Sequence, residues 1–318
     1  MTPSTSSPPT AAAWPALPAP DDWQEALTTL HMWTQIVGKI RMAQTPLVNH
    51  WWNVALSVTC RGLSTGPMPH GDRRFHVDVD FLDHALRIAD DRGAARSFAL
   101  EPMSVAAFHE RTMDTLRAMG LAVDIWPVPV EVETAIPFAE DETHAHYDPD
   151  AAERFWRALA QADRVCTEFR SRYQGKTSPS HFFWGAFDLA VTRFSGREAP
   201  QHPGGIPNVG DHVMHEAYSH ECHSAGLWPG TGYGEAAFYA YAYPAPDGFA
   251  DYDVRPDAAH YLEGLGEFVL PYEAVRTADD PDAALLAFLQ STYEAAADLG
   301  DWDRDALERS APDGSDRS

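Results

Sequence analysis

The feature that most constrains this fold is a change of hydrophobic period, from the steps of a helix to the alternation of a strand. From Trp23 to Ile40 apolar side chains recur at helical spacing, and Pro46 cannot continue the helix. From Phe75 to Phe81 apolar side chains alternate with His and Asp, as in a half-buried strand. Long amphipathic helices combined with short alternating strands predict an α+β fold.

The same order of elements returns later in the chain. Residues 148–152 and 280–284 share the sequence Asp-Pro-Asp-Ala-Ala, which is typical of a helix start with Asp as N-cap and Pro at the first helical position. We therefore expect two related halves, each with a helix, three to four antiparallel strands and a helix, although similar packing demands could produce this pattern without duplication. The expected segments are a disordered tail (1–20), an N-terminal αβ half (21–134), an acidic connector (135–147), a C-terminal αβ half (148–302) and a polar tail (303–318).

Composition and turn signals give the individual elements within the halves. A second helix is expected over 104–119, where polar and apolar residues again follow a helical spacing. Segments rich in aromatic and β-branched residues are expected to be strands. The expected strands include 48–60, 123–132, 181–193, 215–228, 237–244 and 267–270.

The charge of the chain argues against two classes of partner. The formal net charge is -24 and the pI is about 4.8, so a nucleic acid or an anionic membrane would be repelled. The first residues do not resemble a signal peptide, and no apolar run has the length of about 20 residues that a bilayer requires. Three widely spaced cysteines without a C-x-x-C motif fit a reducing compartment. We expect a cytoplasmic protein without nucleic-acid or membrane partners.

Four runs of residues carry a resemblance to a known family. They are 29–41, 48–52, 181–196 and 217–221, which read TLHMWTQIVGKIR, VNHWW, HFFWGAFDLAVTRFSG and AYSHE. With these runs the chain resembles an uncharacterised bacterial family, domain-of-unknown-function family 5996, over nearly everything between its two tails. The resemblance implies no activity, cofactor or substrate.

Histidines near strand starts are the first candidates for catalysis. His50 and His181 each open an expected strand, where an imidazole could exchange protons near neutral pH or simply fill a corner of the core. His220 and Glu221 lie in a segment that reads HEAYSHECH, and a carboxylate beside an imidazole can form an acid–base couple. The candidate catalytic residues are thus His50, His181, His220 and Glu221.

The same segment leaves a metal cofactor open. Nitrogen and oxygen ligands on one strand face could bind a divalent metal, but the spacing differs from the helical H-E-x-x-H motif, and a solvated strand would need no ligand. The cofactor is therefore unknown, with a divalent metal as one option. A phosphate-binding loop and a dinucleotide-binding motif are both missing from the sequence, so no nucleotide cofactor is indicated.

Basic and polar side chains form a second set of candidates, for substrate binding. His31, Gln35 and Lys39 follow one another at four-residue steps on the expected first helix, away from its apolar side. They could form a clamp for an anion, or a solvated helix face. Arg193 could serve the same clamp, and Tyr218 shares a face with His220 if the segment is extended.

Two functions remain after these observations. One is a small-molecule enzyme with a His/Glu site, with or without a metal, between the two halves. The alternative is a non-catalytic binding or assembly protein, because Tyr239, Tyr241 and Tyr243 put three aromatic rings on one strand face that could form a homodimer interface.

Overall fold

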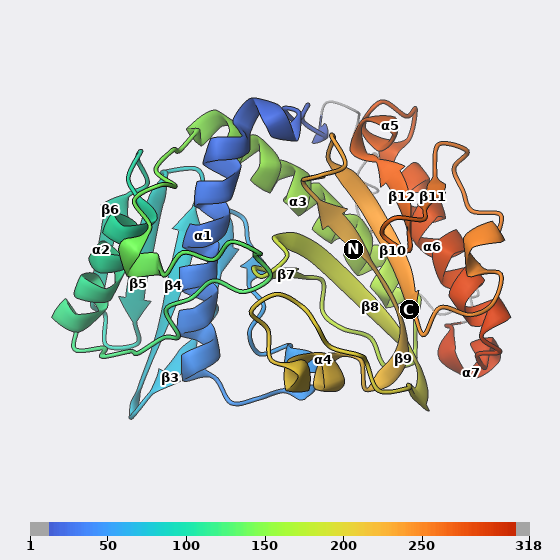
Figure 1. Cartoon of the computed structure of the whole chain (residues 1–318), viewed down its shortest axis with the longest axis horizontal. Helices are drawn as coiled ribbons and strands as arrows, with labels where there is room; N and C mark the ends of the chain where they lie inside the picture. The colour runs from blue at the N-terminus through green and yellow to red at the C-terminus, as the bar shows by residue number, and fades with distance from the viewer. Residues whose placement is uncertain (1–12, 310–318) are drawn as a thin grey trace, which may run out of the picture.

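The computed structural model describes residues 13–309, which form an α+β protein with two antiparallel sheets of six strands each. Figure 1 shows the two sheets side by side, with the N-terminal sheet on the left. The fold class predicted from the sequence is confirmed.

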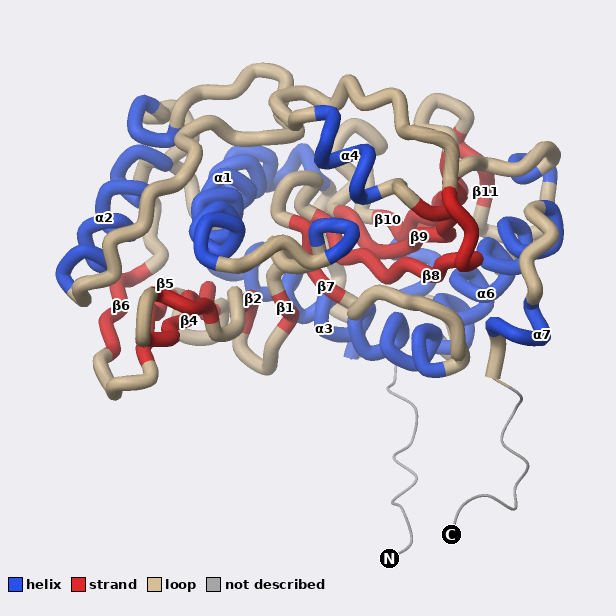
Figure 2. The backbone as a smooth tube through the Cα atoms, turned by 90° about the horizontal axis from the view of Figure 1, so that it is seen from below, coloured by secondary structure: helices blue, strands red, loops and turns tan. Residues whose placement is uncertain are grey.

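The N-terminal sheet has β4 and β5 at its centre. Its strands are β1 (Ser57–Val58), β2 (Gly62–Ser64), β3 (Met68–His70), β4 (Arg73–Asp80), β5 (Ala85–Asp90) and β6 (Ala95–Ala99). The order is β1-β2-β4-β5-β6, and β3 also pairs with β4. Phe75, Val77 and Val79 are buried along β4, so the predicted alternation is confirmed. The helices α1 (Pro20–Gln44) and α2 (Val105–Ala118) lie together on one side of this sheet (Figure 2).

The C-terminal sheet is the floor on which the candidate site is built. Its strands are β7 (His181–Phe183), β8 (Asp188–Glu198), β9 (His220–Trp228), β10 (Ala237–Tyr243), β11 (His260–Leu262) and β12 (Glu267–Pro271). The order across the sheet is β11-β12-β10-β9-β8-β7. The helices α3 (Pro149–Ser171) and α6 (Pro281–Leu299) cover one face, and the short α4 (Asp211–Ala217) lies over the other (Figure 2).

Cap chemistry explains where the two covering helices begin. The Asp148 carboxylate accepts a hydrogen bond from Ala151 N, and Asp280 does the same from Ala283 N, both at 3.0 Å. Each helix has Pro at its first position, as its repeated sequence predicts. Two further short helices, α5 (Tyr272–Arg276) and α7 (Arg304–Leu307), follow the second sheet and α6. Short 3-10 turns occur at Asn49–Trp51, Phe138–Glu140 and Phe249–Asp251.

The two sheets share one core. Leu56 and Phe182 exchange backbone hydrogen bonds of 2.8 and 2.7 Å, which connects the start of the first sheet to the edge of the second. Buried side chains from both parts form one continuous cluster. Each sheet has six strands and not the three to four that the sequence predicts for each half, because short segments such as β1–β3 and β11 also pair into the sheets. The relation between the two halves stays a prediction.

Four segments differ from the strands expected from the sequence. The expected strand 181–193 is a hairpin, in which residues 184–187 form the turn between the antiparallel β7 and β8. Residues 48–60 contain a 3-10 turn and only the two-residue β1, because His50 and Trp51 adopt left-handed backbone angles, with φ of 57° and 60°. Residues 123–132 form no strand, since prolines interrupt the segment. The expected strand 215–228 begins only at His220, and the polar residues before it belong to α4.

The ends of the chain also differ from expectation. Trp14, placed in the expected disordered tail, is buried against Phe238 and Tyr272, with ring centroids 6.2 and 6.0 Å away. Tyr272 Oη donates a hydrogen bond of 2.8 Å to Pro15 O. Residues 304–307 of the expected polar tail form α7. The remainder of both expected tails, 1–12 and 310–318, lies outside the described residues. Among residues 13–309 the helices are all too short or too polar to cross a membrane.

Candidate functional site

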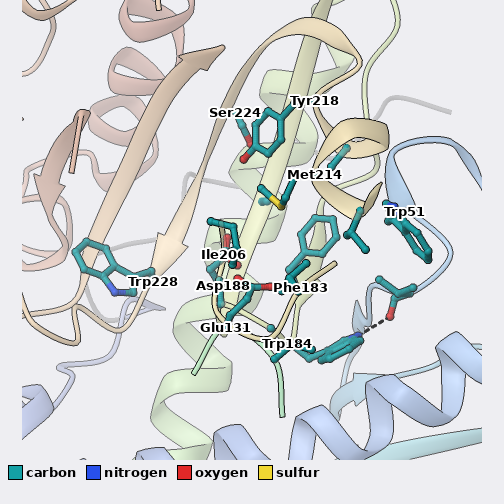
Figure 3. Close-up of a pocket in the computed structure, with 18 of the residues that line it drawn as sticks. Trp51, Glu131, Phe183, Trp184, Asp188, Ile206, Met214, Tyr218, Ser224 and Trp228 are labelled. Carbon is teal, nitrogen blue, oxygen red and sulfur yellow. Dashed lines mark hydrogen bonds between the residues drawn. The ribbon is translucent and has the colours of Figure 1, made fainter. Parts of the chain in front are cut away.

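A large cavity lies on the face of the C-terminal sheet that α3 and α6 leave free. Its volume is about 1230 Å³, and β8, β9 and β10 provide its floor. The connection over 199–219, which includes α4, lies above the floor as a roof. One wall comes from α1 and the segment 126–131, so the cavity lies where the two parts of the chain meet. Figure 3 shows its lining residues gathered from these separate segments.

Most of the lining is aromatic or apolar. Tryptophan and phenylalanine rings enter from several directions, and Figure 3 shows Trp51 and Trp228 on opposite sides. Trp184 is fixed by a hydrogen bond of 2.9 Å from its Nε1 to Val54 O. A cavity of this composition suits a ligand with an aromatic or apolar body. The aromatic lining residues are Trp51, Trp52, Trp126, Phe183, Trp184, Phe194, Tyr218, Trp228, Tyr233, Tyr239 and Tyr241.

Three carboxyl groups break this apolar lining. Asp188 begins β8, Glu267 begins β12, and Glu131 comes from the segment that connects the two parts of the chain. Figure 3 shows Glu131 and Asp188 next to each other at the centre of the site. Thus three segments far apart in sequence bring acidic side chains to one apolar chamber.

Burial raises the pKa of all three carboxyl groups. It raises the pKa of Asp188 to about 6. Burial, together with the negative charge of Asp188, raises the pKa of Glu131 and of Glu267 to about 7. Glu131 is exposed to the cavity, but protein surrounds the cavity at this depth, so the carboxylate is poorly solvated. Near neutral pH the group therefore holds both protonated and ionised carboxyls.

Asp188 has a fixed proton-donating neighbour. Tyr239 Oη donates a hydrogen bond to Asp188 Oδ2, and lies 3.3 Å from Leu189 O. Gly226 makes room for this pair, because a Cβ there would lie 1.6 Å from Leu189 O and 3.0 Å from Tyr239 Oη. Burial and the Asp188 charge raise the pKa of Tyr239 far above its usual value, so the phenol keeps its proton.

Glu131 is held in an unfavourable backbone conformation. Its φ is 59°, in the left-handed region that costs energy for a residue with a Cβ. Gln35 on α1 fixes the preceding residue with two hydrogen bonds, from Nε2 to Val130 O and from Val130 N to Oε1, both 2.8 Å. Glu131 N donates to Pro207 O in the roof at 2.8 Å. Helix and roof together therefore aim this carboxyl into the cavity.

The predicted stripe on the first helix faces this site and not solvent. Gln35 and Lys39 are buried, and His31 Nε2 lies 2.8 Å from Gly185 O. Burial lowers the pKa of His31 to about 4, so this ring is neutral at pH 7. His31 and Gln35 tether the loops, while Lys39 lines the cavity. The expected solvated face is therefore wrong, and an anion clamp at these residues stays a prediction.

Two of the predicted histidines are neighbours. His50 lines the cavity, and its ring lies 5.7 Å from that of His220. His50 Nδ1 donates to Ala217 O at 2.9 Å, which leaves Nε2 to accept from Lys176 Nζ at 2.6 Å. Burial lowers the pKa of His50. The histidine thus links the 3-10 turn at Asn49–Trp51 to the roof.

The other predicted site residues lie elsewhere. His181 is buried outside the cavity, and burial lowers its pKa to about 3. Glu221 follows His220 on β9 but lies outside the cavity, where it accepts hydrogen bonds from Ser195 and Arg197, both at 2.8 Å. Of the four candidate catalytic residues only His50 lines the cavity, so the four do not form one site there.

Arg193 and Tyr218 have different surroundings from one another. Arg193 is buried on the helix-covered side, with its guanidinium 3.4 Å from the centre of the Phe169 ring, and donates to Phe169 O. It does not line the cavity. Tyr218 does, and its Oη lies 2.8 Å from Tyr241 Oη. Within residues 13–309 no three His, Cys, Asp or Glu side chains are grouped so that they could hold a metal ion.

Sequence reasoning missed the acidic centre of the cavity. Asp188 gave a usable signal, because it is a charged residue within the apolar run from Phe182 to Val191. The alternation of Tyr239, Tyr241 and Tyr243 predicts that Tyr239 shares a strand face with the other two, but its orientation towards Asp188 depends on the pairing of β8, β9 and β10. Glu131 gave no signal, since its segment has no regular period and its neighbours come from α1 and the roof.

Fold and cavity together define a two-sheet α+β protein with an acidic cavity whose walls are mainly aromatic. The chain belongs to the family described as a family of unknown function (DUF5996), whose model matches residues 14–309. Neither the curated proteins nor the solved structures contain a match to this chain.

Proposed function

We propose that this chain is an enzyme that performs general acid–base chemistry on a small molecule in the acidic cavity. One observation carries the proposal: Glu131, Asp188 and Glu267 converge from three separate segments in a chamber whose other walls are mainly aromatic and apolar. Poorly solvated carboxyls cost stability unless they pair with cations, and these three have no ion pair in the described part of the chain. Such a cost is common at sites that act on a ligand.

The walls indicate the kind of molecule that would bind. Tryptophan rings on opposite sides of the cavity favour a planar or apolar body, and the volume of about 1230 Å³ leaves room for a ligand of drug-like size together with water. The polar groups lie mainly at the floor, where Asp188, Tyr239 and Glu267 would contact a hydroxyl, amine or carbonyl group of the ligand. The polar groups of the floor would then set the orientation of the ligand, and the aromatic walls would contribute most of its affinity.

The carboxyls supply the chemistry. A general acid and a general base work best when their pKa values lie near the working pH, and those of Glu131 and Glu267 are about 7. Since the charge of Asp188 raises both, loss of one proton makes loss of the next harder. One carboxyl can therefore donate a proton while another accepts one. Tyr239 keeps the ionised form of Asp188 oriented.

A ligand panel tests binding and turnover in turn. Aromatic alcohols, amines and carbonyl compounds are added to the protein, the melting temperature is measured, and each mixture is analysed by mass spectrometry for a new product. We expect some members to raise the melting temperature and one class to react. Asp188→Asn and Glu131→Gln should reduce turnover by at least about 100-fold, since proton transfer commonly contributes that much.

The chain offers a matched control for the Tyr239 and Asp188 pair. Tyr252 Oη donates to Asp298 Oδ2 at 2.7 Å outside the cavity. Tyr239→Phe should lower turnover, whereas Tyr252→Phe should leave it unchanged. The proposal is overturned if no panel member binds, or if binding and turnover do not respond to any of the three carboxyls.

Binding without reaction is the second candidate. Tyr239 and Tyr241, two of the three tyrosines on one face of β10, line the cavity. Their position supports ligand binding better than a homodimer contact. A carrier would show saturable stabilisation by the panel and no product under any condition. The turnover measurement separates these two functions.

A further inference from the structure

We infer that Lys39 is a nucleophile that forms an imine with an aldehyde or ketone substrate in the cavity. The inference rests on the proposed acid–base function and adds to it the chemical class of the substrate. It is carried by the position of this amine, which is buried, lacks a partner and belongs to the wall of the acidic chamber.

The amine is fixed against one residue of the cavity wall. Lys39 is 1% exposed, and its Nζ lies 5.7 Å from the centre of the Trp184 ring. The residue before Lys39 also packs closely against Trp184, because a Cβ at Gly38 would lie 2.2 Å from the same ring. Gly38 and Lys39 therefore lie on the side of α1 that faces Trp184.

Lys39 has no charge partner to explain its burial. In the described part of the chain Nζ has neither a hydrogen-bond partner nor a carboxylate within ion-pair distance. Burial lowers the pKa of the amine to about 8, so a useful fraction is uncharged near neutral pH. An uncharged, poorly solvated amine is the form in which lysine attacks a carbonyl carbon.

Arg193 shows how this protein surrounds a buried cation that has a structural role, and its surroundings differ from those of Lys39. Arg193 is also buried, but three aromatic rings surround its guanidinium within 5 Å and one of its nitrogens donates to Phe169 O. It lies away from the cavity. Lys39 faces a single aromatic ring, has no hydrogen-bond partner in the described part of the chain and lines the cavity. A purely structural role therefore explains its burial less well than it explains the burial of Arg193.

A proton donor lies beside the same tryptophan. Gly185 follows Trp184 directly, and a Cβ at this glycine would lie 2.0 Å from Glu131 Oε1. The carboxyl of Glu131 therefore lies against the residue next to Trp184, whose ring the amine faces. An acid in this place can protonate an oxygen that leaves from the carbonyl carbon.

The reaction balances with groups already in the cavity. The Nζ lone pair forms a bond to the carbonyl carbon, and the oxygen becomes the hydroxyl of a carbinolamine after a proton passes to it from nitrogen. Glu131 then protonates that hydroxyl, the C–O bond breaks, water leaves and a C=N bond forms. The nitrogen returns its remaining proton to Glu131, so the acid is regenerated and no oxidant or reductant is required.

The composition of the chain makes the test clean, because Lys39 and Lys176 are its only two lysines. The folded protein is incubated at pH 7.5 with cinnamaldehyde and sodium cyanoborohydride, digested, and mapped by mass spectrometry. A reduced imine adds the mass of the aldehyde less one oxygen atom. Burial lowers the pKa of both amines. We expect roughly tenfold more label on Lys39, whose amine has no hydrogen-bond partner in the described part of the chain, than on the exposed Lys176, whose Nζ donates to His50 Nε2 at 2.6 Å. In urea both lysines should label alike.

Two variants and one substrate analogue show whether a negative labelling result contradicts only the imine or also the proposed function. Lys39→Met should lose the adduct and keep stabilisation by cinnamyl alcohol, which fills the cavity but forms no imine, while Lys176→Arg should keep both. If cinnamyl alcohol binds and that binding depends on Asp188, but Lys39 gains no label, the imine is overturned and the proposed function survives. If neither compound binds and no label appears, both are overturned. Equal labelling of the two lysines in the folded protein also overturns the imine.

Discussion

Asp188 illustrates how a single side chain can lower the stability of the protein for the sake of a site. Burial raises its pKa to about 6 from 3.8. The folded state therefore holds the proton more tightly than the unfolded chain, and this group lowers stability as the pH rises from about 4 to about 6, with the full cost above that range. Asp188→Asn removes the charge and keeps an oxygen for Tyr239. We expect the variant to match the wild type near pH 4 and to be more stable by about 1–3 kcal/mol at pH 7.5, as measured by urea unfolding.

Asp298 provides a control of opposite sign. Although burial raises its pKa, hydrogen bonds from Tyr252 and Arg304 lower it overall. Its contribution to stability is present above the unfolded pKa and is lost as the pH falls, so Asp298→Asn should destabilise the protein at neutral pH. A neutral-pH loss of stability in Asp188→Asn as well would contradict the first prediction.

Gly226 is a second position at which the site depends on one side chain, because the missing Cβ leaves room for the Tyr239 and Asp188 pair. A Cβ would meet the backbone oxygen of Leu189 at 1.6 Å, and backbone cannot move aside cheaply. We expect Gly226→Ala to lower the free energy of unfolding by about 1–3 kcal/mol, since overpacking costs this much in a tight core. Gly264 lines the same cavity with nothing within 4 Å of its Cβ position, so Gly264→Ala should change stability by less than about 0.5 kcal/mol. Chemical denaturation measures both, and similar values for the two variants would refute the prediction.

Among single residues, the sequence identified some that line the cavity but not the carboxyl groups at its centre. Lys39 and His50 were candidates from their types and spacing, and both line the cavity. Their roles could not be foreseen, because each depends on a partner more than 100 residues away, Trp184 for Lys39 and Ala217 for His50. Glu131 lay in a segment without periodicity, so no local pattern could reveal it.

Among the elements, α1 connects the two parts of the chain through its polar side. Gln35 makes both hydrogen bonds to Val130, next to Glu131. Gln35→Met keeps the volume but leaves a backbone N–H and C=O without partners. We expect a loss of about 2–3 kcal/mol in stability and weaker ligand binding, because the Glu131 segment would move. Calorimetry and chemical denaturation measure the two effects.

Gln24 on the same helix supplies the control. Its Nε2 donates to Thr28 Oγ1 within α1 and touches no loop of the site. Gln24→Met should change stability by less than about 0.5 kcal/mol and leave ligand binding intact. A Gln35→Met protein that binds ligand as the wild type does would show that this tether does not position Glu131.

Elements with strong local signals were predicted well. Aspartate caps with a following proline gave the starts of α3 and α6, and alternation gave β4. The errors fell where tertiary contacts override local preference. The aromatic run at 48–52 turns back because His50 and Trp51 take left-handed angles supported by the roof, through the His50 bond to Ala217 O. The polar residues of α4 carry no apolar period, since none of them is buried.

The charge of the whole molecule leads to a prediction that no single contact could make. With a formal net charge of -24, approach to a phosphate backbone meets repulsion before any local contact forms. Gel shifts with duplex DNA, single-stranded DNA and RNA at low salt should show no complex. A salt-sensitive submicromolar complex would overturn this prediction and point to a basic groove.

The connection over 199–219 gives the family a way to diversify. Glu198 and His220 pair across its base, so β8 and β9 would remain adjacent strands if the connection were shorter, longer or different in sequence. Because closing a longer loop costs little extra entropy, evolution can exchange the roof without rebuilding the sheet beneath it. The acidic floor belongs to the strands, whereas Ile206, Val209 and Met214 belong to the roof. Relatives could therefore keep one chemistry and diverge in the molecules they admit, much as antibodies vary their loops on a constant framework.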